Sequence, residues 1–183
     1  MERLAEQGYI DLFYGDECPA SLVPCVPYGW QFKEEQVSLP STSGKGVTCF
    51  VLINRPSKCW FRTTDKMVNA ATVVSWLDEF AQNLSRLTVV VLDNAPVHQS
   101  KEVRKRLAGW QKRGLFVFFL PRFCPHLNIA ETLWRKLKYE WLGAEDYADK
   151  EALWYGVWQA LAAVGNALTI GFSAFNHEKQ KMK

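Results

Sequence analysis

The sequence lacks the features of an exported or membrane-bound protein. Its 183 residues contain no run of about 18 uninterrupted apolar residues, the length that a membrane-spanning helix needs. The stretch from Met1 to Tyr9 carries acidic side chains, whereas a secretory signal starts with basic residues and continues into an apolar run. Internal repeats and low-complexity linkers are also missing. The pattern therefore gives no indication of export or membrane insertion.

The cysteines do not form the pattern of a disulfide framework or of a thiolate zinc site. There are five, an odd number, and no C-x-x-C pair occurs among them. Disulfide-rich domains and zinc sites both depend on paired cysteines. We therefore expect reduced thiols, several of them buried, at Cys18, Cys25, Cys49, Cys59 and Cys124.

The length and composition favour one compact domain. With 48% hydrophobic and 14% aromatic residues, 183 residues suffice for one good core but leave little room for a second full domain. We therefore expect residues 1–183 to form a single domain, in which residues 144–183 supply a C-terminal helix and a basic tail.

Positive charge is concentrated in one segment. The formal net charge is only +3, but the segment from Gln99 to Arg122 holds seven Lys or Arg and one Glu, so it carries +6 and the remainder carries −3. Such a patch can bind a polyanion by releasing phosphate counterions. A solvated helix face has the same charge pattern, so the patch alone does not identify a ligand.

The apolar periodicity predicts an ordered series of strands and helices. Short apolar runs predict strands at residues 9–14, 47–53, 59–64, 87–92 and 115–120. Apolar residues at helical spacing predict helices at about residues 67–84, 100–112, 128–142 and 150–168. The stretch from Cys18 to Gly46 contains several prolines and glycines and is expected to be irregular, with a short hairpin near Tyr28-Gly29-Trp30.

This order of elements is that of a ribonuclease H-like fold, an α/β fold with a mixed five-stranded sheet flanked by helices. Acidic residues follow the first and fourth strands, at Asp16 and Asp93, and Glu131 lies on the helix after the fifth strand. Because the first and fourth strands are neighbours in such a sheet, the two aspartates can face one another while Glu131 approaches from the crossing helix. Three carboxylates so placed repel one another unless cations lie between them, and oxygen ligands suit Mg²⁺ or Mn²⁺.

Two segments carry a specific sequence pattern. The first reads Val91-Leu92-Asp93-Asn94-Ala95-Pro96-Val97-His98, and the second reads Pro125-His126-Leu127-Asn128-Ile129-Ala130-Glu131-Thr132-Leu133-Trp134-Arg135-Lys136-Leu137-Lys138. A strand followed by L-D-N-x-x-x-H and then by P-x-L-N-x-x-E-x-x-W-x-x-L-K resembles the DDE transposases of bacterial insertion sequences that are related to the Tc/mariner group. The 37 residues between Asp93 and Glu131 are similar to the spacing in that group, and the resemblance weakens only after about Gly143.

The resemblance implies a metal-dependent enzyme that cleaves DNA strands and transfers them during DNA transposition. Asp16, Asp93 and Glu131 would be its catalytic and metal-binding carboxylates, with the two aspartates holding or bridging two Mg²⁺ or Mn²⁺ ions and Glu131 completing the second site. In such a two-metal phosphoryl transfer, one ion activates water or a DNA 3′-hydroxyl and the other stabilises the leaving oxygen. The substrates would be double-stranded element ends and target DNA, and the protein would act in the cytoplasm, associated with the nucleoid.

The first carboxylate has two competitors. In the family it belongs to a strand-D-E element ahead of a Trp-containing segment, which resembles Asp16-Glu17 followed by Tyr28-Gly29-Trp30. Because side chains on a strand alternate between faces, Glu17 points away from Asp16, and the two are not expected to bind the same ion. Asp11 lies in the body of the strand on that opposite face and is expected to be a paired strand residue.

Several residues near the carboxylates are candidates for supporting roles. Asn94 follows the second carboxylate directly. His98 either contacts the scissile phosphate or orients a ligand, or it is a surface histidine near a helix start. Asn128 is a good helix N-cap with Glu131 three positions later, so helix initiation competes with metal binding for that carboxylate. His126 is interpreted as structural.

Basic side chains on two predicted helices are candidates for contacts with the DNA backbone, which position a duplex without reading its sequence. They are Lys101, Arg104, Lys105, Arg106, Arg135, Lys136 and Lys138. Trp134 and Trp141 on the second of these helices are interpreted as core residues, not as base-stacking groups. The apolar face of the last helix, with Trp154 and Trp158, is interpreted as a cover for the sheet.

Two departures from the family pattern limit what the resemblance implies. Many relatives read L-N-P-I-E where this chain reads Leu127-Asn128-Ile129-Ala130-Glu131, a change with little expected chemical consequence. Family members usually begin with helix-turn-helix DNA-binding domains, whereas this chain starts almost directly at the first catalytic strand. We therefore expect a fragment, a truncated copy or one part of a split reading frame, with a separate N-terminal DNA-binding polypeptide and a homodimer as candidate assemblies.

Two other functions remain open on the sequence. A different nuclease of the same fold, such as a Holliday-junction resolvase, would share the carboxylates but not the L-N-x-x-E-x-x-W signature. A decayed or domesticated core would bind nucleic acid without cutting it. The presence of all three carboxylates argues against decay, whereas the missing N-terminal domains argue for it.

Overall fold

The computed structural model describes residues 1–25, 32–34 and 46–172. The hairpin expected near Tyr28-Gly29-Trp30 and the basic tail at the C-terminus lie outside these ranges. Within them, no helix has both the length and the apolar character needed to cross a membrane. The described part includes both segments that carry the sequence pattern.

A mixed five-stranded sheet forms the centre of the molecule, with the strand order β3-β2-β1-β4-β5. Its strands are β1 (Asp11–Ala20), β2 (Val47–Ile53), β3 (Cys59–Thr64), β4 (Thr88–Leu92) and β5 (Leu115–Phe119). The central strand β1 pairs antiparallel with β2 and parallel with β4. This order puts the strand that contains Asp16 beside the strand that ends just before Asp93.

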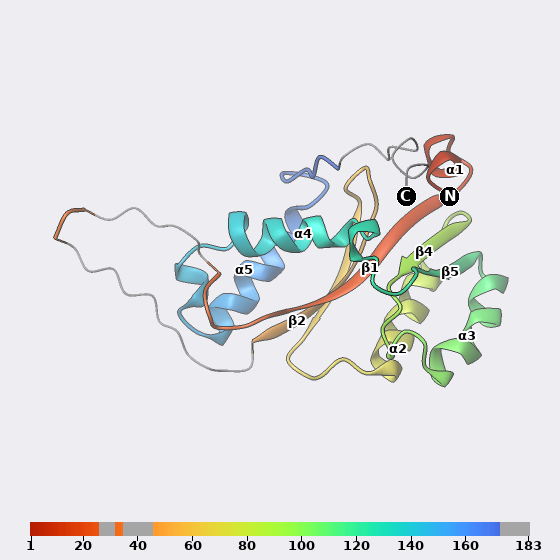
Figure 1. The fold of residues 1–183 in the computed structure, drawn as a ribbon, viewed down its shortest axis with the longest axis horizontal. Helices are drawn as coiled ribbons and strands as arrows, with labels where there is room; N and C mark the ends of the chain where they lie inside the picture. The colour runs from red at the N-terminus through yellow and green to blue at the C-terminus, as the bar shows by residue number, and fades with distance from the viewer. Residues whose placement is uncertain (26–31, 35–45, 173–183) are drawn as a thin grey trace.

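Helices cover both faces of the sheet (Figure 1). They are α1 (Glu2–Glu6), α2 (Ala70–Gln82), α3 (Lys101–Lys112), α4 (Ala130–Lys136) and α5 (Lys150–Ala163), with short helical turns η1 (Pro125–Leu127), η2 (Leu137–Trp141) and η3 (Glu145–Tyr147). Buried residues of α2 and α3 form one core with Phe13, Phe50 and Leu92. Buried residues of α4 and α5 form a second core with Cys49 and Val51. The predicted mixed sheet flanked by helices is therefore confirmed.

β1 is longer than the sequence predicts and contains Asp16 within the strand. The sequence pattern ends the strand at Tyr14, because Gly15-Asp16-Glu17 has the composition of a turn. In the structure the strand continues to Ala20 and pairs with β2 over all of the added residues. Cys18 and Ala20 are buried in the core below α4 and α5. Cross-strand pairing and burial override the local turn preference, so the prediction that Asp16 follows the strand end is wrong.

The register between β1 and β4 determines where the two aspartates lie. Tyr14 lies beside Val91 in this parallel pair. Two residues further along each of these two segments, Asp16 is level with Asp93. Because β4 ends at Leu92, Asp93 directly follows its strand, as the sequence predicts. Neighbouring parallel strands therefore bring both carboxyl groups to one region of the sheet.

The single helix predicted over residues 128–142 consists of two pieces and is preceded by a short 3-10 turn. The 3-10 turn η1 comes first, α4 carries Glu131 in its first turn, and the π-helical turn η2 follows without a break. Leu133, Trp134 and Leu137 are buried in the core against the sheet. Their burial holds α4, and with it Glu131, over β1.

Other helices also differ from the predictions. α1 forms where no helix is expected. α2 begins at Ala70, later than predicted, because the side chain of Asn69 accepts a hydrogen bond from the backbone N–H of Thr72 at 3.0 Å and caps the helix. α5 ends at Ala163, before the predicted end at Leu168. None of these differences moves an acidic residue of the predicted site.

Candidate active site

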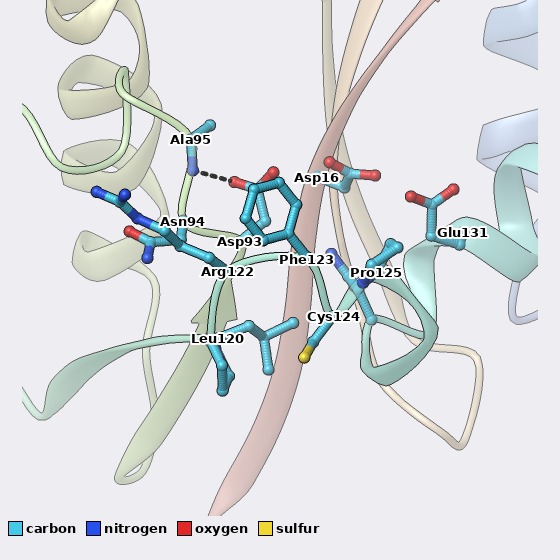
Figure 2. A pocket seen from close by; sticks show the side chains of 12 residues that line it. Asp16, Asp93, Asn94, Ala95, Leu120, Arg122, Phe123, Cys124, Pro125 and Glu131 are labelled. Carbon is cyan, nitrogen blue, oxygen red and sulfur yellow. Dashed lines mark hydrogen bonds between the residues drawn. The ribbon is translucent and has the colours of Figure 1, made fainter.

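A pocket of about 280 Å³ lies where β1, β4, α4 and the loop after β5 meet. All three predicted carboxylates line it, with Asp16 from β1, Asp93 from the end of β4 and Glu131 from the first turn of α4 (Figure 2). Asn94 and the loop from Pro121 to Pro125 form much of the remaining wall. Elements far apart in the sequence thus bring three acidic side chains to one pocket.

Asp16 is held by a tryptophan on the face of the sheet that α4 covers. The indole N–H of Trp134 donates to Asp16 Oδ2 at 2.9 Å. Burial raises the pKa of Asp16 to about 7; the indole hydrogen bond opposes this rise, and the charges of the neighbouring carboxylates add to it. An ionised Asp16 therefore has a high free energy unless positive charge lies close to it.

Asp93 is oriented by two hydrogen bonds to the same oxygen. Its Oδ1 accepts from the backbone N–H of Ala95 at 3.0 Å and lies 2.6 Å from Nδ1 of His98. The hydrogen bond from His98 lowers the pKa of Asp93. This carboxyl group is therefore ionised at neutral pH, and its neighbours determine its direction.

His98 bridges two carboxylates in the interior, so its interpretation as a surface histidine is wrong. Its side chain is 0% exposed, and its Nε2 lies 2.8 Å from Glu17 Oε1 while Nδ1 contacts Asp93. Burial opposes protonation, but the hydrogen bonds and charges of the two carboxylates outweigh it and raise the pKa of His98 to about 9. The ring is an imidazolium at neutral pH and donates from both nitrogens. Of the predicted roles of His98, the buried position fits the one in which it orients a ligand.

The acidic residues of β1 alternate between the two faces of the sheet as predicted. Asp16 meets Trp134 on α4, whereas Glu17 reaches His98 on the opposite face. Asp11 pairs with a neighbouring arginine, as expected for a paired strand residue, with 3.5 Å between its Oδ1 and the guanidinium. Neither Glu17 nor Asp11 lines the pocket.

Asn128 connects α4 to β1 and also accepts a backbone N–H in the first turn of α4, as the predicted helix-capping side chain would. Its Nδ2 donates to the carbonyl of Gly15 at 3.0 Å, and its Oδ1 accepts from the backbone N–H of Ala130 at 3.1 Å. Ile129, which directly precedes α4, makes no side-chain capping bond of its own. The predicted competition for Glu131 is not observed, because among the described residues no hydrogen bond holds its exposed carboxylate.

The donor set of the pocket fits a hard divalent cation. Three carboxylates and the amide oxygen of Asn94 offer oxygen ligands, which Mg²⁺ and Mn²⁺ prefer. Within the described ranges, no three His, Cys, Asp or Glu side chains lie close enough together to surround one ion. Burial and repulsion from the other carboxylates both raise the pKa of Asp16. A cation in the pocket would offset both effects.

None of the basic residues proposed for backbone contacts lines the pocket. Three are exposed and make no ion pair within the described part of the chain: Lys101, Lys105 and Arg135. The other four make local contacts: Arg104 with Gln99, Arg106 with Asp78, Lys136 with Glu140 and Lys138 with Cys18. The first three therefore have the fewest competing contacts within the chain.

Three contributions to the pocket are not predicted by the sequence pattern. Trp134 is a core residue as interpreted, but its indole also binds Asp16. Glu17 acts on the second carboxylate through a histidine. Arg122 and Phe123 line the pocket from a loop without a distinctive motif. Only Trp134 has a signal in the sequence, because its position three residues after Glu131 places both on one side of a helix.

The thiols differ in a way that a labelling experiment can measure. Burial raises the pKa values of Cys49 and Cys59 from 9.0 to about 12, which lowers their thiolate fraction at neutral pH by about a thousand-fold. Cys124, in contrast, lines the pocket. A maleimide should therefore modify Cys124 in the native protein, and the buried Cys49 only after denaturation, as peptide mass spectrometry would record. Equal native labelling of Cys49 and Cys124 would contradict the burial.

Solved structures with a similar fold include transposases and an integrase. A Mos1 transposase paired-end complex with the left transposon end has a TM-score of 0.51 at 17% identity and covers 88% of this chain and 56% of that chain. A Mos1 mariner paired-end complex with Mn has a TM-score of 0.54 at 19% identity and covers 92% of this chain and 60% of that chain. The catalytic core domain of BIV integrase has a TM-score of 0.55 at 13% identity and covers 87% of this chain and 86% of that chain. The ribonuclease H-like fold predicted from the sequence is thereby confirmed.

The sequence itself matches one family and spans only part of the Mos1 transposase. A comparison with curated proteins gave no match. The family described as DDE superfamily endonuclease matches residues 11–154, a range that includes Asp16, Asp93 and Glu131. The chain spans 56% of the length of the Mos1 transposase chain. Because the family match covers most of the sequence and all three carboxylates of the pocket, this chain belongs to the DDE superfamily endonuclease family.

Proposed function

We propose that this chain is the catalytic core of a transposase and performs metal-dependent DNA cleavage and strand transfer. The observation that carries the proposal is the convergence of Asp16, Asp93 and Glu131 on one pocket from three separate elements. The family match and the likeness of the fold to transposases and an integrase support it. The insertion-sequence pattern around the second and third carboxylates favours transposition over other reactions of this fold.

The hydrogen bonds of the two aspartates leave one oxygen of each for a cation. His98 and Ala95 both bind Oδ1 of Asp93, which leaves Oδ2 for the pocket. The indole of Trp134 binds Oδ2 of Asp16 and leaves Oδ1. We propose that these oxygens hold two Mg²⁺ or Mn²⁺ ions and that the unbound carboxylate of Glu131 completes the second site. When bound, the ions would supply an activated oxygen nucleophile and stabilise the leaving oxygen.

DNA is the proposed substrate, both as element ends and as target. Exposed Lys101, Lys105 and Arg135 are proposed to bind backbone phosphates, which positions a duplex without reading its sequence. We propose a single catalytic domain over residues 1–183 and recognition of the element ends by an N-terminal DNA-binding polypeptide. A homodimer would bring two element ends together. Such an assembly would act in the cytoplasm at the nucleoid.

A plasmid-nicking assay tests the metal dependence. Purified protein is expected to nick supercoiled DNA with Mg²⁺ or Mn²⁺, to stop when EDTA is added and to resume when the metal is restored, because ionised oxygen ligands alone cannot neutralise the reacting phosphate. Binding of Mn²⁺ is measured separately by tryptophan fluorescence, since Trp134 contacts Asp16 directly. Nicking that persists in EDTA, or a protein that binds no Mn²⁺, would contradict the proposal.

The products distinguish this function from the two alternatives. A transposase joins a DNA 3′-hydroxyl to target DNA, a junction nuclease cuts branched DNA in preference to linear DNA, and a remnant binds without cutting. The intact carboxylates and the hydrogen bonds that orient the two aspartates argue against a remnant. The sequence pattern around Asp93 and Glu131, which a junction nuclease would lack, argues against the other alternative. Joined products from a linear duplex and a circular target would favour the transposase.

A further inference from the structure

One aromatic side chain at the pocket is exposed and lies on an unfavourable backbone. Phe123 is 96% exposed and lines the pocket together with the three carboxylates (Figure 2). Its φ of 60° lies in the left-handed region, which residues other than Gly, Asn and Asp rarely adopt. Neither burial of the ring nor backbone preference explains a phenylalanine at this position. An exposed aromatic ring on a strained backbone beside an active site points to a role in binding.

The loop that carries Phe123 is constrained at both ends. The backbone N–H of Leu120 donates to the carbonyl of Leu92 at 2.8 Å, which ties the start of the loop to the end of β4. Pro121 and Pro125 restrict the backbone on either side of the ring. The ring is therefore presented from a restrained loop, and binding to it requires little further loss of conformational entropy.

The groups that would lie near this ring follow from the position of the carboxylates. If the pocket cleaves DNA, the scissile phosphate lies at Asp16, Asp93 and Glu131, and the nearest planar groups are the bases on either side of it. Arg122 is exposed, lines the same pocket and can bind an adjoining phosphate. In an intact duplex the faces of the bases are stacked on their neighbours. An aromatic side chain can stack only on a base that has left the duplex.

We propose that Phe123 is a stacking platform for an unpaired base next to the scissile phosphate. The inference rests on the proposed function and deepens it, because it states that the pocket binds DNA whose strands are separated at the point of cleavage. Phe123 then positions the substrate and takes no part in the chemistry. Since every base has a π face, the contact tolerates any sequence and adds no sequence recognition.

Two DNA probes test the platform in EDTA, where no cleavage occurs. One is a blunt duplex, and the other is the same duplex with a single-stranded extension containing aminopurine, a fluorescent base whose emission falls on stacking. The unaltered protein is expected to quench the extension. Phe123→Ala should abolish the quenching and weaken binding of the extended probe by about 10-fold or more, with the blunt duplex unaffected. Phe123→Trp should retain both properties.

Two further variants separate the loss of the ring from other effects. Phe123→Gly adopts a positive φ without steric cost, so its melting temperature should equal or exceed that of the unaltered chain while quenching is lost. Tyr155→Ala removes another exposed aromatic ring, on α5 and outside the pocket lining, and should change neither probe. Equal weakening on both probes would overturn the inference. So would an altered sedimentation coefficient with unchanged quenching, which would assign Phe123 to a protein interface.

Failure of this inference is distinguishable from failure of the proposed function. If the unaltered protein nicks plasmid DNA with Mg²⁺ but the Phe123 variants still quench aminopurine, the platform is overturned and the proposed function stands. If the unaltered protein binds neither probe and nicks no plasmid, both are overturned.

Discussion

Glu131→Gln and Asp93→Asn are each expected to lower DNA nicking by at least about a thousand-fold, which corresponds to about 4 kcal/mol of transition-state stabilisation. Both changes keep the size of the side chain and remove the negative charge that would hold a cation. Glu131→Gln is the cleaner test, because no hydrogen bond within the described residues depends on that carboxylate. Single-turnover rates with Mg²⁺, together with circular dichroism to verify folding, measure the effect.

Two exposed acidic residues outside the pocket provide matched controls. Glu140 pairs with Lys136 in the same helical segment as Glu131, and Asp65 pairs with Lys150 at the surface. Exposed ion pairs contribute little to stability, so Glu140→Gln and Asp65→Asn should leave both folding and nicking close to normal. Nicking that survives in Glu131→Gln, or that is lost equally in Glu140→Gln, would rule out the assignment of the metal site.

His98→Ala is expected to have the second-largest effect, on both stability and activity. The substitution leaves the carboxylates of Glu17 and Asp93 without the imidazolium between them. Removing one partner of a buried ion pair costs about 3–5 kcal/mol. We expect a loss of about 3 kcal/mol in the free energy of unfolding, at the lower end of this range. The side chain of Asp93 is 44% exposed, so water can partly solvate its unpaired charge. Urea unfolding of the metal-free protein measures this loss.

The effect of His98→Ala on activity should appear in the metal dependence of the reaction. A residue that orients a metal ligand typically changes metal affinity or activity by about 10- to 100-fold. The Mg²⁺ concentration for half-maximal nicking should therefore rise, whereas a residue with only a structural role would not change it. His126→Ala, an exposed histidine of η1, is the control and should leave both measurements unchanged.

A second variant tests whether His98 acts through its two carboxylates. If the stability loss arises from uncompensated charge, His98→Ala should cost much less in a Glu17→Ala background than in the unaltered chain, because only one carboxylate then remains. Additive losses would show that the ring contributes by packing alone. They would also remove the reason to assign His98 a role in orienting Asp93.

The fold was predictable where periodicity and tertiary packing agree. β2 and β3 have the predicted boundaries, because their apolar runs are the residues that the sheet buries or pairs. β1 was predicted too short, because pairing with β2 carries the strand through residues that favour a turn. The helix that carries Glu131 was predicted as one piece, although it consists of α4 and a π-helical turn. Burial of side chains in the folded protein decides where these strands and helices begin and end. Local propensity does not include that burial.

The candidate site was predictable from the residues next to the carboxylates, and its orienting contacts were not. Asp93 and Glu131 stand in recognisable patterns, and strand alternation distinguishes Asp16 from Glu17. The partners that orient them come from other elements, as His98 does for Asp93 and Trp134 does for Asp16. Contacts across large sequence separations depend on how the helices pack on the sheet. No local pattern in one sequence specifies them.

The sequence by itself determined the family, the order of the elements and the identity of three carboxylates, because adjacent residues and periodicity carry those signals. Only the tertiary structure decided that the three share one pocket, that His98 is an interior imidazolium joining Glu17 to Asp93, and that Phe123 stands at the pocket on a restrained loop. The physical reason is that charge, burial and hydrogen bonding depend on neighbours in space. The register of β1 with β4 and the packing of α4 on the sheet bring these neighbours together.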